Sequence, residues 1–348
     1  METQVIKIES LDEKDKIHQA ATALGQGKLV VIPTETVYGL GAHGLREDSV
    51  KGIFEAKGRP QDNPLILHVA NQDQVLDLVQ AIPPAAKDCM DMFWPGPLTL
   101  IFKRSKIVPD LVTAGLETVA IRMPSHAIAH AILEEAAIPV AAPSANTSGR
   151  PSPTRVSHVL EDLDGKVDMI VDGGFTDVGI ESTILDVTVD PPTILRPGGV
   201  TKEDLEDLLG TVAEDTSHYD AESGTVPKSP GMKYRHYAPQ ADTTVFAGNI
   251  ENVAKEINRR IQENKGEKVA VLCTTETQAL YQGAHLLLDM GSRSHLEEVA
   301  KNLFNSLRAC DEAGVDRIYV EGFDFEGLGV GIMNRLLKAS GGKVVFGL

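Results

Sequence analysis

Two cations stand one residue apart in the sequence KGRPQDNP, which begins at Lys57 and follows a stretch with helical periodicity. Lys57 is a compact charge that suits a triphosphate, and Arg59 offers a planar fork that matches phosphate oxygens. The chain has no GxxxxGKS or GxxxxGKT sequence, which excludes a phosphate cradle of the P-loop kind. Cations also favour an ordinary solvated helix end, where the helix dipole attracts them. The pair therefore indicates a polyanion site only in combination with other motifs.

Short polar side chains follow two apolar runs. The segment VIPTETVYGLG supplies Thr34 and Thr36, and the segment APSANTSGRPSP supplies Ser144, Asn146 and Ser148. In turns such side chains commonly bond their own backbone. A cleft that recognises adenine or ribose also needs fixed neutral groups of this kind.

Three more side chains stand at or near the ends of apolar runs. Arg122 follows ETVAI, where an arginine suits a carboxylate, although a salt bridge at the strand end is the alternative. His68 lies in LILHV, a context more typical of a core histidine than of a catalytic one. Arg196 precedes PGG, and glycines let a backbone approach a ligand closely or simply form a turn.

Covalent catalysis is not expected. No nucleophile elbow is present, and Cys89 lies in a helical pattern without a neighbouring base. Glu35 and Glu181 resemble a carboxylate pair, but their spacing does not show that they meet. The three scattered cysteines form neither a disulfide framework nor a zinc-ligand pattern, so we expect each to be a buried small hydrophobe or an idle thiol.

Taken in chain order, these motifs closely resemble the YrdC-like threonylcarbamoyl-AMP synthase family in its two-domain form. The match extends over essentially the whole chain, because the same order continues through FWPGPLTL, ETVAIRMP, VDGG, ESTI, LRPGG and SPGMKYRHYAP. Any one of these motifs alone would be weak.

The resemblance implies that L-threonine, bicarbonate or CO2, and ATP are converted to L-threonylcarbamoyl-adenylate with release of pyrophosphate. A separate tRNA threonylcarbamoyl transferase would then use the adenylate to modify the adenosine next to the anticodon. Mg²⁺ is implied as the partner of ATP, held mainly by the phosphates and not by metal ligands of the protein.

The resemblance also implies roles for individual residues. Catalysis and phosphate binding are assigned to Lys57 and Arg59. Contacts to threonine are assigned to Thr34, His68, Arg122 and Ser182. Further contacts to ATP are assigned to Gln61, Thr118, Ser144, Asn146, Arg196 and Tyr234, with a weaker assignment for Arg150.

Composition limits the possible partners. The chain has 348 residues, 42% of them apolar, and a net charge of −17. An acidic surface argues against tight nucleic-acid binding, so we expect tRNA to bind at most weakly. No apolar run approaches the roughly 18 residues of a membrane span, and no signal-peptide core is present. We expect a cytoplasmic protein without membrane contacts.

Two α/β domains must position these residues. Residues 1–210 alternate apolar runs with amphipathic stretches, which predicts a mixed sheet of about seven strands. The family resemblance adds that this sheet is twisted and open, with a concave active-site face. Residues 244–348 show a cleaner alternation that predicts a smaller, doubly wound Rossmann-like domain, with helices near 251–263, 276–282, 294–313 and 329–339. Gly327, Gly329 and Gly331 favour close helix packing over a second nucleotide site.

Residues 211–243 are predicted to be a linker. Its second half is rich in tyrosine and cations, which favours a lid formed by residues 227–239 over a passive spacer. A lid would shelter an unstable carbamate from water.

Two other functions remain open on the residues alone. One is an RNA-binding module that uses the cationic cleft, which salt-dependent RNA binding without nucleotide turnover would favour. The other is a carbamoyl transferase, which dependence on carbamoyl phosphate would select. The motifs ESTI, LRPGG and KYRHYAP favour the synthase.

Overall fold

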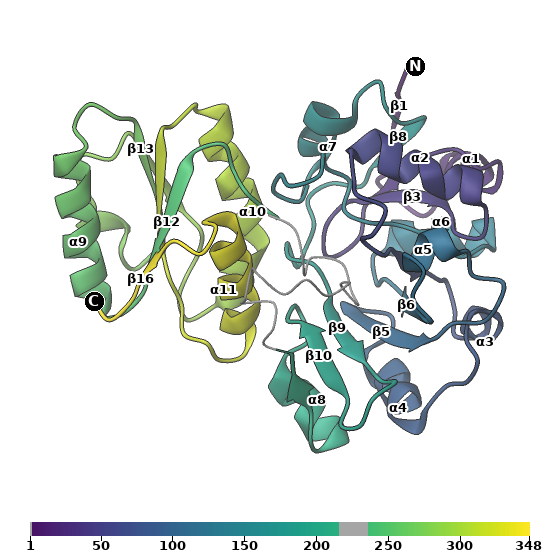
Figure 1. Cartoon of the computed structure of the whole chain (residues 1–348). Coiled ribbons are helices and arrows are strands. Elements are labelled where there is room, and N and C mark those ends of the chain that lie inside the picture. Colours follow the sequence, from purple (N-terminus) through teal and green to yellow (C-terminus); the bar gives the residue numbers. More distant parts are fainter. Residues whose placement is uncertain (1, 216–235) are drawn as a thin grey trace. The chain divides into compact units, whose positions relative to one another are not determined.

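The computed structural model describes residues 2–215 and 236–348 (Figure 1). The chain forms two units. Unit 1 comprises Met1–Ser148, Ser152–Asp177 and Glu181–Tyr234. Unit 2 comprises Gly149–Pro151, Val178–Ile180 and Arg235–Leu348. The predicted boundaries at residues 210 and 243 stay a prediction.

Unit 1 is built on an 11-stranded mixed sheet with the order β1-β8-β2-β3-β7-β4-β6-β5-β9-β10-β11. The strands are β1 (Gln4–Lys7), β2 (Val30–Ile32), β3 (Gly39–His43), β4 (Ile66–His68), β5 (Leu98–Lys103), β6 (Thr118–Arg122), β7 (Val140–Ala141), β8 (Met169–Asp172), β9 (Thr183–Asp186), β10 (Thr193–Arg196) and β11 (Ala213–Glu214). The prediction of a mixed α/β sheet is confirmed.

The predicted number of about seven strands is wrong, because β1, β3, β10 and β11 were missed. Strand β3 is interrupted by glycines, which are unfavourable in isolated strands. Neighbouring strands supply the hydrogen bonds that hold it, because β3 pairs on both sides with β2 and β7.

Helices accompany the strands of unit 1. They are α1 (Lys14–Gly25), α2 (Glu47–Lys57), α3 (Asp73–Leu78), α4 (Pro84–Phe93), α5 (Asp110–Thr113), α6 (Ala127–Ala136), α7 (Val156–Leu163) and α8 (Lys202–Leu209). Successive strand residues point to opposite faces of the sheet, so Val31 joins one large apolar cluster while Val30 and Ile32 join another. The sheet is therefore buried on both faces around β2.

Unit 2 contains a five-stranded parallel sheet with the order β14-β13-β15-β12-β16. Its strands are β12 (Asp242–Phe246), β13 (Val269–Cys273), β14 (Leu286–Asp289), β15 (Arg317–Glu321) and β16 (Val344–Val345). Its helices are α9 (Ile250–Glu263), α10 (Leu296–Glu312) and α11 (Leu328–Ala339). In Figure 1 α9 lies on one side of this sheet and α10 and α11 lie on the other, which confirms the doubly wound prediction.

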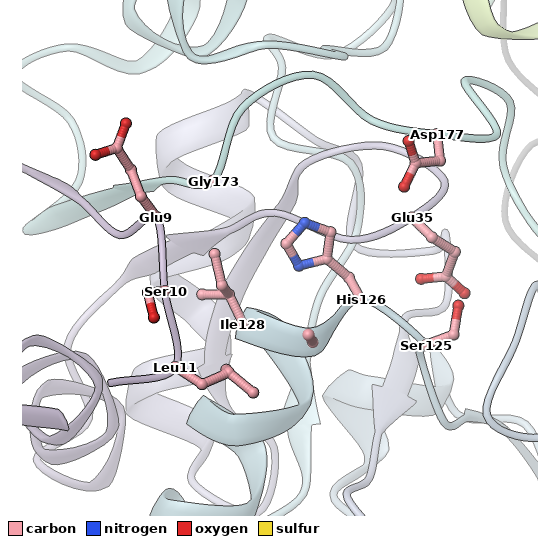
Figure 2. Close-up of a pocket in the computed structure, with 10 residues that line it drawn as sticks. Glu9, Ser10, Leu11, Glu35, Ser125, His126, Ile128, Gly173 and Asp177 are labelled. Atoms are coloured by element: carbon pink, nitrogen blue, oxygen red, sulfur yellow. The ribbon is translucent and has the colours of Figure 1, made fainter. Parts of the chain in front are cut away.

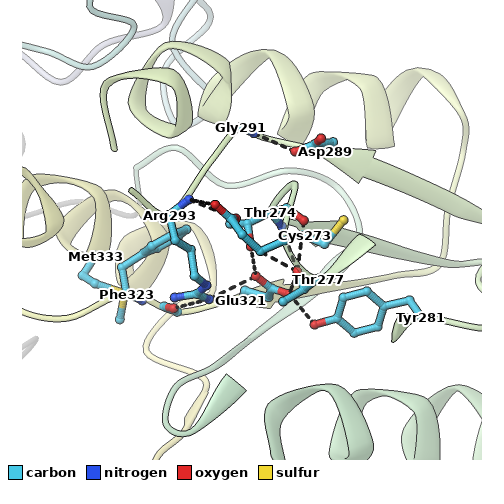
Figure 3. Close-up of polar contacts among 12 residues, drawn as sticks. Cys273, Thr274, Thr277, Tyr281, Asp289, Gly291, Arg293, Glu321, Phe323 and Met333 are labelled. Carbon is cyan, nitrogen blue, oxygen red and sulfur yellow. Dashed lines mark hydrogen bonds and ion pairs between the residues drawn. The ribbon is translucent and has the colours of Figure 1, made fainter. Parts of the chain in front are cut away.

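The predicted helix at 276–282 is wrong. The structure has only a 3₁₀ turn, Gln278–Leu280, between β13 and β14. Figure 3 shows why: the hydroxyls of Thr277 and Tyr281 turn inward and donate to the buried carboxylate of Glu321. Side chains that bind inward at both ends of the segment compete with a regular helix.

Glu321 is fully buried at the end of β15, and both of its oxygens are bonded. Thr274 Oγ1 donates to it at 2.9 Å and Arg293 Nη2 at 3.0 Å, besides Thr277 and Tyr281 (Figure 3). Burial and the neighbouring Glu321 charge raise the pKa of Tyr281, so its hydroxyl keeps its proton. A buried charge with this many partners stabilises one arrangement of the loops around it.

The glycines of the β15–α11 connection allow close packing. A Cβ on Gly329 would lie 2.2 Å from the carbonyl oxygen of Asp324, so only glycine fits there. This contact supports the packing interpretation of the glycine pattern.

The three cysteines are free and buried, as predicted, and burial raises the pKa of each thiol to about 12. Among the described residues, no helix combines the length and the apolar character that crossing a bilayer requires.

Candidate active site

Lys57 and Arg59 flank the C-terminal end of α2. Gly58 takes a left-handed conformation with φ of +61°, and the N–H of Arg59 donates to the carbonyl of Phe54 at 3.0 Å. This is a helix ending that glycine favours. The alternative interpretation of this pair, as cations at an ordinary solvated helix end, is wrong. Lys57 is 2% exposed and Arg59 is 8% exposed.

Lys57 meets the segment that follows β7. Its Nζ donates to the carbonyl of Asn146 at 2.6 Å and to that of Ser144. In return the N–H of Ser148 donates to the carbonyl of Lys57 at 2.9 Å. The structure thus brings together three residues that the sequence assigned to ATP, namely Lys57, Ser144 and Asn146.

Arg59 is held by the turn that follows it. Its Nη2 donates to the carbonyl of Pro64 at 2.9 Å and to that of Asn63 at 3.3 Å. Asn63 is buried, whereas Gln61 is exposed. The run QDNP therefore forms a turn around the guanidinium.

A row of polar side chains crosses three neighbouring strands. His68 on β4 is the register partner of Arg122 on β6, and Arg122 is the partner of Thr99 on β5. Register partners point to the same face of a sheet, so these three lie on one face. Thr118 lies four residues before Arg122 on β6, which places it on that face as well.

Arg122 is clamped by three groups. Its Nε donates to the carbonyl of Gly96 at 3.2 Å, and its Nη1 donates to Thr36 Oγ1 at 2.8 Å. Its Nη2 lies 2.6 Å from the carboxylate of Glu35. The guanidinium is 4% exposed, so its direction is fixed before any substrate arrives.

Thr34 orders the turn that carries these partners. Its hydroxyl donates to the carbonyl of Val37 at 2.6 Å and lies 2.9 Å from the hydroxyl of Thr36. The sequence left a salt bridge of Arg122 open, and the structure shows one, but the sequence did not identify Glu35 and Thr36 as its partners. Their position directly beside Thr34 in PTET was the available signal, but no spacing predicts contact across 86 residues.

Burial and the adjacent Arg122 charge lower the pKa of His68 to about 3. Its Nδ1 lies 3.3 Å from the carbonyl of Ile66. The imidazole is therefore neutral at pH 7 and is a weak proton acceptor there.

Ser182 joins β5 to β10. Its hydroxyl lies 2.7 Å from that of Thr99, and Arg196 Nη2 donates to its carbonyl at 2.9 Å. A Cβ on Gly198 would meet the carbonyl carbon of Ser182 at 2.7 Å, so the PGG turn requires glycine at this close approach. Ser182, Arg196 and the row on β4, β6 and β5 thus form one polar region.

Two family models match consecutive parts of the chain. Residues 22–198 match the Sua5/YciO/YrdC model, described as "Telomere recombination". Residues 200–341 match a model described as "Threonylcarbamoyl-AMP synthase, C-terminal domain".

The similarity to known proteins extends from end to end. The threonylcarbamoyl-AMP synthase of Pyrococcus abyssi is 47% identical over 348 residues, which cover 99% of both chains. The chain belongs to the threonylcarbamoyl-AMP synthase family. The family member from Bacillus subtilis is 48% identical over 95% of this chain and 94% of its own. The crystal structure of P. abyssi Sua5 complexed with L-threonine has a TM-score of 0.93 with this chain, at 46% identity and 99% coverage of both.

This synthase-family chain also has an acidic pocket of about 340 Å³ in unit 1 (Figure 2). Glu35 lines it together with Asp177 and Glu9, and His126 lies in its wall. Burial lowers the pKa of His126. Burial alone would raise the pKa of Glu35, but the charge and contact of Arg122 outweigh it and leave that pKa below its usual range. Glu35 is therefore charged at neutral pH.

Arg150 belongs to unit 2, where its Nη2 lies 3.9 Å from the carboxylate of Asp311. Tyr234 and residues 227–235 of the predicted lid lie outside the described residues. Glu181, which resembled a partner for Glu35, instead accepts a hydrogen bond from Ser152.

Proposed function

We propose that this chain synthesises L-threonylcarbamoyl-adenylate from L-threonine, bicarbonate or CO2, and ATP, and releases pyrophosphate. One observation carries the proposal: four cations assigned to the substrates, Lys57, Arg59, Arg122 and Arg196, are all buried in a chain that aligns end to end with such synthases. We further propose that it works in the cytoplasm and supplies a tRNA threonylcarbamoyl transferase.

In the first step the threonine amine adds to CO2, forms a carbon–nitrogen bond and loses a proton. We propose that Arg122 binds the threonine carboxylate, because its clamped guanidinium keeps one direction. His68, Ser182 and Thr34 would line the rest of the amino acid. With a pKa of about 3, His68 is a contact and not the acceptor of that proton at neutral pH.

In the second step a carbamate oxygen attacks the α-phosphorus, and the bond to pyrophosphate breaks. We propose that Lys57, Arg59 and Arg196 bind the phosphates, while Ser144 and Asn146 bind the nucleoside. Gln61, Thr118 and Tyr234 are proposed as further nucleotide contacts. Such a reaction asks the protein mainly for positioning and charge neutralisation.

Mg²⁺ would be carried by the phosphates of ATP and would neutralise their charge. Within residues 2–215 and 236–348, no group of three or more His, Cys, Asp or Glu side chains is placed to hold a metal ion. At many ATP sites Mg²⁺ is bound largely by the substrate phosphates and by water.

The test is pyrophosphate release from Mg-ATP, with threonine and bicarbonate each supplied or withheld. Release only with both supports the synthase. Release with neither indicates a nucleotidase. If no pyrophosphate is released, carbamoyl transfer and RNA binding become the leading alternatives. Turnover that depends on carbamoyl phosphate would indicate the first, and salt-dependent binding of labelled RNA would indicate the second.

Lys57→Ala and Arg59→Ala should each lower kcat/KM for ATP by about 100-fold or more, because each removes a charge from the phosphates. Lys51→Ala is the matched control, since Lys51 is exposed on the same helix and its Nζ lies 3.6 Å from the carboxylate of the exposed Glu55. Thermal unfolding is measured in parallel. A loss of activity that merely follows a loss of stability would contradict the assigned role.

A further inference from the structure

Two short loops interrupt unit 1. Residues 149–151 and 178–180 belong to unit 2, although the residues on both sides of each loop belong to unit 1. The first loop follows the SAN segment, and the second precedes ESTI. Both therefore lie next to residues assigned to the substrates.

Arg308 of α10 holds the first loop. Its side chain is fully buried, and its Nε and Nη2 donate to the carbonyl of Pro151 at 3.1 and 2.7 Å. Burying a guanidinium is costly unless it is bonded, so the Pro151 carbonyl is strongly specified as a partner.

Gly179 in the second loop packs on the backbone of the same helix. A Cβ at Gly179 would lie 2.4 Å from Lys301 Cα and 2.6 Å from the carbonyl oxygen of Ala300. Residues 301 and 308 are seven apart, which is close to two helical turns. One face of α10 therefore holds both loops.

The two loops lead to one hydrogen bond in unit 1. Ser152 follows the first loop directly, and Glu181 follows the second. The hydroxyl of Ser152 donates to the carboxylate of Glu181. The next residue, Ser182, contacts Thr99 and Arg196. A displacement of the second loop would therefore move Ser182 through two residues of backbone. A displacement of the first loop would reach it through the Ser152–Glu181 hydrogen bond.

We infer that α10 is a positioning element for the active site, with Gly179 and Arg308 as positioning residues that act through Glu181 and Ser182. This gives the C-terminal unit a part in the reaction without direct contact to substrate. The inference rests on the proposed function, because it requires Ser182 to bind threonine.

The test is Gly179→Ala against Gly115→Ala. The two glycines have nearly equal φ, +78° and +79°, so both variants carry the same backbone strain. A Cβ at Gly115 meets nothing within 4 Å, whereas at Gly179 it meets α10. Gly179→Ala should raise KM for threonine and lower kcat/KM by about tenfold or more, because small misplacements of binding groups are costly. Gly115→Ala should keep the kinetic constants of the wild type.

Equal kinetic constants in the two variants would overturn the inference. A loss of kcat/KM in Gly179→Ala that is matched by a loss of its thermal stability would overturn it as well. If Gly179→Ala does not fold, Arg308→Lys decides, since lysine keeps a single donor for Pro151. A raised KM for threonine at unchanged thermal stability then supports the inference, and unchanged kinetics overturn it. The wild type is assayed alongside. If the wild type itself releases no pyrophosphate in the presence of threonine, the proposed function fails, and the result does not bear on α10.

Discussion

At the scale of single residues, the site is built from buried cations whose described partners include backbone carbonyls. Lys57 donates to Asn146, Arg59 to Pro64 and Arg196 to Ser182. A carbonyl oxygen orients a cation without supplying a full negative charge. Arg122 also contacts the charged Glu35 at 2.6 Å. Its partial neutralisation suits a single carboxylate better than a triphosphate.

The depressed pKa of His68 predicts a loss of stability in acid. The folded chain keeps this imidazole neutral down to about pH 3, whereas the unfolded chain protonates it near pH 6.5. The unfolded state therefore binds more protons as pH falls below about 6.5, and stability decreases there by up to about 1.4 kcal/mol per pH unit from this group.

Denaturant unfolding at pH 7.5, 6.5 and 5.5 checks this. His68→Gln should show a flatter dependence on pH than wild type, because it removes the group whose pKa is lowered by folding. Identical slopes in the two proteins would contradict the lowered pKa.

At the scale of elements, the end of α2 combines stability with function. The left-handed Gly58 ends the helix between the two cations that we propose bind phosphate, so its conformation sets the directions of Lys57 and Arg59. The hydrogen bond from the Arg59 N–H to the Phe54 carbonyl closes this ending. One glycine therefore positions both side chains.

Gly58→Ala should cost about 1 kcal/mol of stability and also lower kcat/KM for ATP, because alanine resists the left-handed conformation. A Cβ there meets no atom within 4 Å, so the cost comes from backbone strain and not from a clash. Gly25→Ala is the control: Gly25 ends α1, lacks a positive φ and has equal space. It should stabilise by about 0.5 kcal/mol and leave activity unchanged. Equal effects of the two substitutions on stability and kinetics would refute this account.

At the scale of the whole molecule, the net charge of −17 separates the chain from proteins that hold nucleic acid by its phosphates. We propose that the buried cations bind small substrates, whereas the surplus of carboxylates repels a large polyanion. A supplier of an activated group for tRNA modification does not need to bind tRNA itself.

Labelled tRNA should therefore show no saturable binding at protein concentrations below about 10 µM in 0.15 M salt. Proteins that bind nucleic acid without specificity have Kd values of about 1–100 µM, and we expect this acidic chain to bind no more tightly than they do. Fluorescence anisotropy measures this directly. Submicromolar binding that weakens steeply with added salt would show instead that the cations form an RNA surface.

The sequence predicted the long amphipathic elements best. The helices α9, α10 and α11 lie within one or two residues of their predicted bounds, because each has a stripe of apolar residues that packs against the sheet. Strand β3 and the turn at 278–280 were missed because their conformations depend on partners distant in the chain. Glu321 alone accounts for the latter, through Thr277 and Tyr281.

The sequence by itself determined the two α/β domains, the family and the residue types available for chemistry, since motif order and hydrophobic periodicity are local properties of the chain. Only the tertiary structure decided which residues meet. It paired Arg122 with Glu35 and Thr36, joined Lys57 to Asn146, and held residues 149–151 and 178–180 against α10. Strand register and the burial of charge produce these contacts, and both depend on residues far apart in the chain that spacing alone does not bring together.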